Sequence, residues 1–278
     1  MSLRNEQNWD TSLHNQNAGM SVAKVKCGVS RSGQYESAFS RVELLAVLAV
    51  LALLAIIQSS ALAHIKGNSH RAVCADNLRR LALSWLMYAD DNRGRLAPNG
   101  DSPSTNNWVS GVLDFSGTDN TNLARITQAK LYPYNKAVTI YRCPDDLSAV
   151  RGQLRIRSYS MSGWVGEGTI AFTSGFQTIT NRSQLRQPDQ TFVFIEEHPD
   201  SINDGLFVVD MTPGPGARII DFPAAYHYYG ANVGFADGSA HSRHWLDPRT
   251  SPVRLSFLVP SPNNPDVAWL QSISTYRQ

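Results

Sequence analysis

The feature that most constrains this chain is an apolar run, LLAVLAVLALLAII, from Leu44 to Ile57. The run alone is shorter than the roughly 20 residues that a membrane-spanning helix needs. A helix extended from Phe39 to Ala63 would be about 37 Å long, enough to cross a hydrocarbon core of about 30 Å. We therefore expect residues 39–63 to form a transmembrane or assembly helix, and residues 64–278 to form a globular domain.

One carboxylate, Glu43, stands at the start of this run, in the order Phe39-Ser40-Arg41-Val42-Glu43. A charged side chain at membrane depth is costly unless a partner compensates it. Ala38-Phe39 followed by Val42-Glu43-Leu44-Leu45 resembles the cleavage and methylation site of type IV prepilins and type II secretion pseudopilins.

The resemblance implies that a prepilin peptidase removes a cytoplasmic leader, residues 1–38, by cutting between Ala38 and Phe39. Phe39 would then be the methylated first residue of the mature protein. Glu43 would pair with the N-terminal ammonium of a neighbouring pilin or pseudopilin subunit during assembly. The implied location is the inner membrane, crossed once, with the N-terminus cytoplasmic and the globular domain periplasmic or at the cell surface.

An alternative stays open at the end of the same run. Ala61-Leu62-Ala63 has the small-x-small form of an ordinary signal-peptidase site. Cleavage after Ala63 would release an exported soluble binding protein or enzyme that begins at His64.

Apolar residues with helical spacing follow the run. They are Leu78, Leu81, Ala82, Trp85, Leu86 and Ala89. We expect a kink at Gly67-Asn68-Ser69, and a helix end near Asp91–Gly94, where Gly94 can take a left-handed cap conformation. The sequence thus predicts a helix with a membrane half and an amphipathic half.

The rest of the chain is predicted to form strands and turns. Thr191–Ile195 and Leu206–Val209 are β-rich runs that resemble a hairpin pair. Asn232–Ala236 and Ser239–His241 flank Asp237-Gly238, a dipeptide typical of tight hairpin turns. The predicted fold class is α+β, with one long N-terminal helix packed on an antiparallel β-sheet with long loops.

A second resemblance lies in the C-terminal half. His227, nine intervening residues and then Asp237-Gly238 match the H-x9-DG signature of large prepilin-type proteins. The region that resembles them spans about 191–245. One interpretation of the signature is that His227 and Asp237 hold the hairpin in position.

The cysteines are Cys27, Cys74 and Cys143, without the paired spacing of a zinc site. Cys27 would leave with the leader. Cys74 and Cys143 would lie outside the cytoplasm, where a disulfide can form. A bridge between them and two buried free thiols both remain open.

Oxygen-bearing side chains gather after the strand that ends at Ile195. Hard cations prefer such ligands, so one interpretation is a Ca²⁺ site, although the spacing is not that of an EF-hand. The other is a solvated acidic turn. The candidate ligands are Glu197, Asp200, Asn203, Asp204 and Asp237.

Charge and motifs point away from catalysis and from nucleic acid. The formal net charge is +2, without a run of like charges. The sequence contains no phosphate-binding loop, G-x-S-x-G or H-E-x-x-H motif. We expect a structural, non-enzymatic subunit of a secretion or pilus-like filament.

Overall fold

The computed structural model describes residues 40–100, 104–167, 173–253, 255 and 258–278, without the side chains of residues 56–68. The chain divides into two compact units, Met1–Leu53 and Leu54–Gln278, and each is described by itself. The predicted processing residues Ala38 and Phe39 lie outside the described residues.

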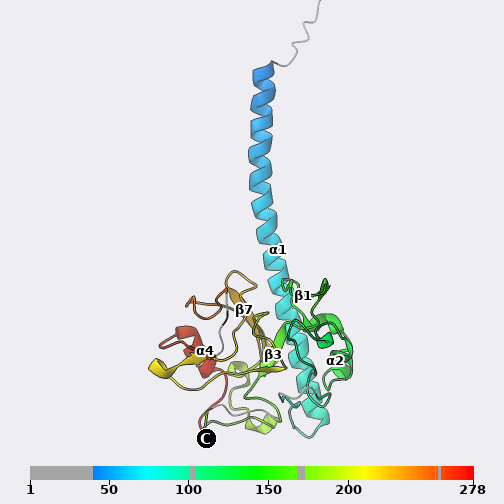
Figure 1. Ribbon diagram of the computed structural model, residues 1–278, viewed down its shortest axis with the longest axis vertical. Helices are drawn as coiled ribbons and strands as arrows, with labels where there is room; N and C mark the ends of the chain where they lie inside the picture. Colours follow the sequence, from blue (N-terminus) through cyan, green and yellow to red (C-terminus); the bar gives the residue numbers. More distant parts are fainter. Residues whose placement is uncertain (1–39, 101–103, 168–172, 254, 256–257) are drawn as a thin grey trace, which may run out of the picture. The chain divides into compact units, whose positions relative to one another are not determined.

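Helix α1 runs from Arg41 to Asp91 (Figure 1). At its start the Ser40 amide donates to Glu43 Oε2 at 2.8 Å, and the Glu43 amide donates to Ser40 Oγ at 3.2 Å. This reciprocal pair is a capping box, which supplies partners for amides at the helix start. Within the described parts of the chain, no helix has the length and apolarity needed to cross a membrane.

The last turns of α1 have the amphipathic character that the sequence predicts. Leu78, Trp85 and Ala89 are fully buried, whereas Arg79 and Arg80 are exposed. Helix α1 continues through Gly67–Ser69, where we expected a kink. The predicted end is confirmed, because α1 stops at Asp91 and Gly94 has a φ of 78°.

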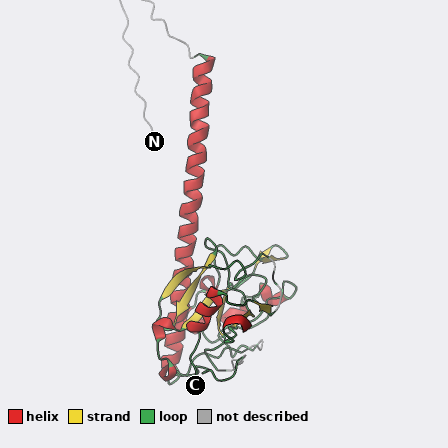
Figure 2. Cartoon of the chain, turned by 90° about the vertical axis from the view of Figure 1, so that its left-hand side faces the viewer, coloured by secondary structure: helices red, strands yellow, loops and turns green. Residues whose placement is uncertain are grey.

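A five-stranded sheet with the order β5-β3-β4-β7-β8 forms the centre of the globular unit (Figure 2). The pairs β3–β4, β4–β7 and β7–β8 are antiparallel, and β3–β5 is parallel. The strands are β3 (Tyr159–Ser162), β4 (Phe192–Glu196), β5 (Leu206–Phe207), β7 (Gly230–Phe235) and β8 (Ala240–His244). The predicted hairpin around Asp237-Gly238 is therefore confirmed as β7–β8.

The central strand β4 is buried along its whole length. Phe194 packs in one apolar cluster with Leu78 and Trp85 of α1. Ile195 packs in a second cluster, which contains Leu270 of α4 (Pro265–Ser272). The neighbouring strand β7 approaches α1 so closely that a Cβ on Gly234 would lie 3.3 Å from Leu78 Cβ.

The remaining elements are short and lie between loops. The small sheets pair β1 (Ala149–Val150) with β2 (Gln153–Leu154), and β6 (Arg218–Ile219) with β9 (Val259–Pro260). Two further α-helices are α2 (Ala124–Thr127) and α3 (Tyr132–Asn135). The 3₁₀ helices are η1 (Thr118–Asn120), η2 (Val138–Tyr141), η3 (Arg182–Gln184), η4 (Pro188–Gln190) and η5 (Gly214–Gly216).

The α+β class is compatible with these elements, but the predicted long helix packed on an antiparallel sheet is wrong. The sheet is mixed, because β3 and β7 occupy both edges of β4 and leave β5 to pair with β3. Leu206–Val209 is therefore not the hairpin partner of β4. The chain also divides after Leu53. Among the described side chains of α1, the buried apolar residues lie between Cys74 and Ala89.

Asp221 gives the globular unit a pH-dependent stability. Burial and the Asp204 carboxylate together raise the pKa of Asp221 to about 7. The Val208 amide, which donates to Asp221 Oδ2 at 2.6 Å, opposes this rise. An acid with a raised folded-state pKa stabilises the fold at low pH, and that contribution is lost as the pH rises from about 4 through 7.

We therefore predict that Asp221→Asn stabilises the protein at pH 8, by on the order of 2 kcal/mol. The amide oxygen can still accept from Val208 but cannot ionise. Urea unfolding between pH 4 and 8 should show the difference from wild type shrinking toward pH 4. Asp189→Asn, at an exposed position, is the control and should show no such trend; an Asp221→Asn effect independent of pH would contradict the prediction.

Candidate metal centre

Four buried side chains from distant parts of the sequence converge beside the end of β4. They are Cys74, Cys143, Glu196 and His227. One potential ligand atom from each lies within 4.8 Å of the corresponding atoms of the others. His227 is 6% exposed and the other three are fully buried.

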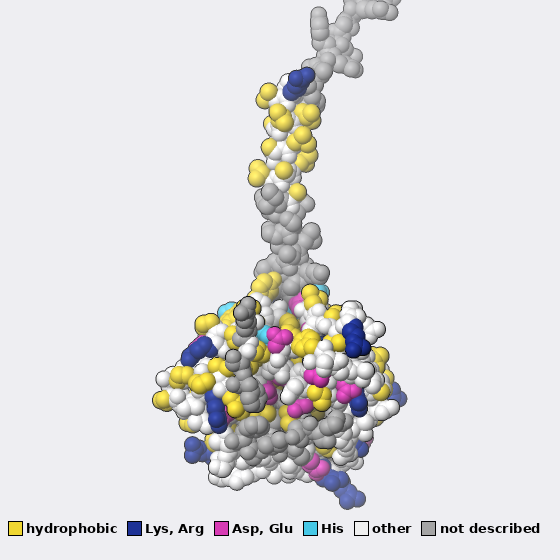
Figure 3. Space-filling model, viewed as in Figure 1, with side chains coloured by type: hydrophobic (Ala, Val, Ile, Leu, Met, Phe, Trp, Pro, Cys, Tyr) yellow, Lys and Arg dark blue, Asp and Glu magenta, His cyan; other side chains and the backbone are white. Residues whose placement is uncertain are grey.

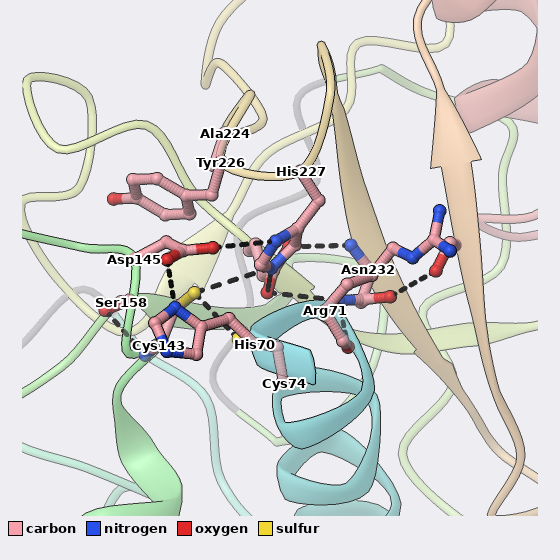
Figure 4. A network of polar contacts seen from close by, with 12 residues as sticks. His70, Arg71, Cys74, Cys143, Asp145, Ser158, Ala224, Tyr226, His227 and Asn232 are labelled. Atoms are coloured by element: carbon pink, nitrogen blue, oxygen red, sulfur yellow. Dashed lines mark hydrogen bonds and ion pairs between the residues drawn. The ribbon is translucent and has the colours of Figure 1, made fainter. Parts of the chain in front are cut away.

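The two cysteines come from α1 and from the loop after η2. Both are free thiols, and their sulfur atoms lie 2.7 Å apart. Cys74 lies on the buried face of α1, which fixes its direction. The Cys143 amide donates to Ser158 Oγ at 3.1 Å (Figure 4). Ser158 Oγ in turn donates to Asp146 Oδ2 at 2.6 Å. These contacts hold the Cys143 loop against the sheet.

Glu196 is the last residue of β4, and both of its carboxylate oxygens have partners. The Asn232 amide of β7 donates to Glu196 Oε2 at 2.7 Å. Glu196 Oε1 lies 3.1 Å from His227 Nε2. Asn232 Nδ2 also donates to the Arg71 carbonyl at 3.2 Å, which ties the end of the sheet to α1.

A tight turn before β7 places His227. Tyr228 and Tyr229 have φ values of 53° and 57°, and the His227 amide donates to the Gly230 carbonyl at 3.1 Å. Two consecutive positive φ values are typical of a type I′ turn, which favours Gly, Asn or Asp. Each residue in this left-handed conformation costs about 1–3 kcal/mol, and such residues are frequent at functional sites. The turn directs the imidazole into the cluster.

The two nitrogen atoms of the His227 ring contact different groups. Its Nε2 lies 3.5 Å from Cys143 Sγ, close to Glu196 Oε1. Its Nδ1 lies 3.2 Å from Asp145 Oδ2, and the other oxygen of Asp145 makes a short contact with His70 of α1 (Figure 4). The Asp145 carboxylate therefore lies beside Nδ1, and Nε2 points into the cluster.

Burial sets the protonation of the cluster when no cation is bound. The pKa of Cys143 is raised well above its ordinary value by burial and by contact with Cys74. The hydrogen bond to Cys143 would lower the pKa of Cys74, but burial and Glu196 outweigh it and raise this pKa too. Burial alone would lower the pKa of His227, whereas Cys143 and Glu196 raise it to about 10.

These properties decide between two kinds of chemistry. A nucleophilic cysteine needs a lowered pKa and access to substrate, and neither holds for Cys143. Two thiols, an imidazole and a carboxylate in one buried cluster instead form a ligand set for a transition metal.

The predicted calcium ligands are not brought together. Among the described residues, the four-residue cluster is the one group of His, Cys, Asp or Glu placed to hold an ion. Glu197 is buried and accepts from Ser201 Oγ, whereas Asp200 and Asn203 are exposed. Asp204 accepts from the Leu206 amide, and Asp237 accepts from the Ser239 amide in the β7–β8 turn. These oxygens serve local turns instead of a shared cation.

The sequence singled out His227, Asp237 and Gly238 as one motif, and the structure assigns them separate places. Asp237 and Gly238, with a φ of 90°, form the β7–β8 turn, and His227 enters the cluster. The sequence did not link Glu196 to the cysteines, because these residues are far apart in the chain. The uninterrupted apolar run of β4, Phe192–Ile195, which ends at this carboxylate, is a local signal of its burial.

Comparison of the chain with protein-family models, with curated protein sequences and with solved structures gives no match.

The disulfide between Cys74 and Cys143 stays a prediction, since both residues are free thiols here. We expect a mild oxidant to join them in the metal-free protein, because their sulfur atoms are already neighbours. The test uses a Cys27→Ser background and counts reactive thiols after denaturation. Oxidation should remove both thiols, whereas Cys74→Ser in the same background should keep one. Two thiols that persist after oxidation would exclude the bridge.

Proposed function

We propose that this protein is a membrane-anchored structural subunit of a pilus-like or type II secretion filament, and that it acts by assembly and not by catalysis. The observation that carries the proposal is the apolar surface at the start of α1. Between Val42 and Leu54 the only charged side chain is Glu43. Val42 is 75% exposed and Leu45 is 66% exposed. Figure 3 shows hydrophobic side chains over the described start of α1.

An isolated helix cannot bury such a surface, because its apolar side chains point in all directions. Water-exposed apolar area of this kind costs roughly 25 cal/mol per Å², so it favours lipid or a bundle of like helices. The predicted span, residues 39–63, extends beyond the described side chains at both ends. The proposal therefore assigns this segment to the inner membrane before assembly and to the filament core afterwards.

Glu43 is the second support for the proposal, and it has two possible roles. Its carboxylate caps α1 through the Ser40 amide. In an assembled filament the same exposed carboxylate would pair with the N-terminal ammonium of a neighbouring subunit. Capping and pairing can be separated, because capping requires an oxygen atom whereas pairing requires a charge.

We predict that Glu43→Ala and Glu43→Gln both insert into the membrane but lose filament incorporation by roughly tenfold or more, the effect of about 1.4 kcal/mol. Glutamine keeps the capping oxygen and removes the charge. Ser40→Ala removes the capping hydroxyl and keeps the charge, so it should assemble nearly as wild type. Membrane fractionation measures insertion, and co-purification with sheared filaments measures incorporation. Normal incorporation of Glu43→Gln would contradict the pairing role.

The alternative function, an exported soluble binding protein, is favoured by one feature of the globular unit. A hollow of about 1050 Å³ lies between α1 and the 121–156 segment. Its wall includes Val73, Leu123 and Leu154, together with Asp76 and Arg80. A mostly apolar hollow with a few charged groups is the usual form of a small-molecule site.

The mature N-terminus distinguishes the two functions. We expect N-terminal sequencing and mass spectrometry of the membrane fraction to find methylated Phe39. Deleting the prepilin peptidase from the host should leave the leader in place. A soluble extracytoplasmic product that begins at His64 would reject the filament subunit and favour the binding protein.

A further inference from the structure

The geometry points to a structural zinc site formed by Cys74, Cys143, Glu196 and His227. We propose that Zn²⁺ binds the two cysteine sulfurs, His227 Nε2 and Glu196 Oε1 as four protein ligands. The site is independent of the proposed filament function, because all four residues belong to the unit Leu54–Gln278.

Two distances between the ligand atoms fit this coordination, and the distance between the two sulfurs requires an adjustment. Zn–S bonds of about 2.3 Å and Zn–N or Zn–O bonds of about 2.0–2.1 Å place tetrahedral ligand atoms roughly 3.3–3.8 Å apart. Cys143 Sγ lies 3.5 Å from His227 Nε2, which lies 3.1 Å from Glu196 Oε1. The two sulfurs, 2.7 Å apart, would separate by about 1 Å as the ion enters.

The surroundings of His227 and Glu196 match those of metal ligands. A ligating histidine usually presents its other ring nitrogen to a carboxylate, and His227 Nδ1 faces Asp145 at 3.2 Å (Figure 4). The Glu196 oxygen that does not face the cluster is held by the Asn232 amide. His227 Nε2 and Glu196 Oε1 are the atoms that face the cluster, where Oε1 also lies 3.4 Å from Asn232 Nδ2.

The ligand types select the ion. Thiolates with an imidazole favour zinc, whereas calcium and magnesium prefer oxygen ligands alone. Because four protein groups surround the ion position and all four residues are buried, the site is closed. A closed site serves structure, here by joining α1, the Cys143 loop, the end of β4 and the turn before β7.

Binding is a proton exchange without a redox step. Zn²⁺ forms bonds to both sulfurs, to His227 Nε2 and to Glu196 Oε1. The two thiol protons and the Nε2 proton of the protonated imidazole leave to solvent. The same thiols cannot form a disulfide while they hold the ion. Zinc should therefore protect Cys74 and Cys143 from oxidation.

The test uses the full chain with Cys27→Ser, solubilised in detergent, kept reduced and stripped with a chelator. After addition of Zn²⁺ and gel filtration, we expect about one zinc per chain by plasma mass spectrometry and a melting midpoint raised by roughly 5–10 °C. Co²⁺ in place of zinc should give the intense visible bands of a tetrahedral site and a thiolate charge-transfer band. Oxidant should then remove two thiols from the stripped protein but not from the loaded protein.

Three variants make the assignment specific. Cys143→Ser should lose the thiolate band and most of the zinc. Asp145→Asn provides a readout that does not depend on the folding of Cys143→Ser. It keeps all four ligands, and its zinc affinity should fall 10–100-fold. Asp200→Asn, in the exposed acidic turn, is the matched control and should bind as the parent does.

Three results would overturn the proposal. The first is folded, reduced parent protein that retains no zinc and gives no cobalt bands. The second is Cys143→Ser or Asp145→Asn protein that binds zinc as tightly as the parent. The third is zinc-loaded parent whose two thiols oxidise as fast as those of the stripped protein.

Discussion

Burial of β4 on both faces is the constraint on which the globular unit depends. One face packs against the last turns of α1 and the other against the cluster that includes α4. A strand covered on both sides has no solvent-facing position for a charged side chain, yet β4 ends in Glu196, which is fully buried. An unpaired carboxylate there would be strongly destabilising, so the surrounding segments must supply hydrogen bonds and positive charge.

The cluster supplies both, and this explains several features that otherwise look unrelated. The backbone N–H of Asn232 donates to Glu196, and its side-chain Nδ2 donates to the Arg71 carbonyl of α1. A single residue therefore connects β7, β4 and the helix. The strained turn at Tyr228 and Tyr229 brings the His227 imidazole to the same carboxylate. In the proposed zinc form the ion takes over part of this compensation, and the two buried thiols acquire a role.

The two ends of α1 obey different physical rules. From Cys74 to Ala89 one face of the helix is buried, so polar residues are confined largely to the other face. From Val42 to Leu54 the apolar side chains are exposed. At the start of α1, Ser40 and Glu43 form a reciprocal capping pair.

The sequence by itself determined the features that depend on local spacing. Helical periodicity located the buried face of α1, Gly94 marked its end, and Asp237-Gly238 identified the β7–β8 hairpin. These signals suffice because each involves residues a few positions apart. The pairing of β5 with β3 was not predictable, because it depends on which edges of the sheet other strands have already occupied. The convergence of Cys74, Cys143, Glu196 and His227 likewise came only from the tertiary structure. No two of these residues are close in sequence, and packing of α1 against the sheet is what brings their ligand atoms within bonding reach of one ion.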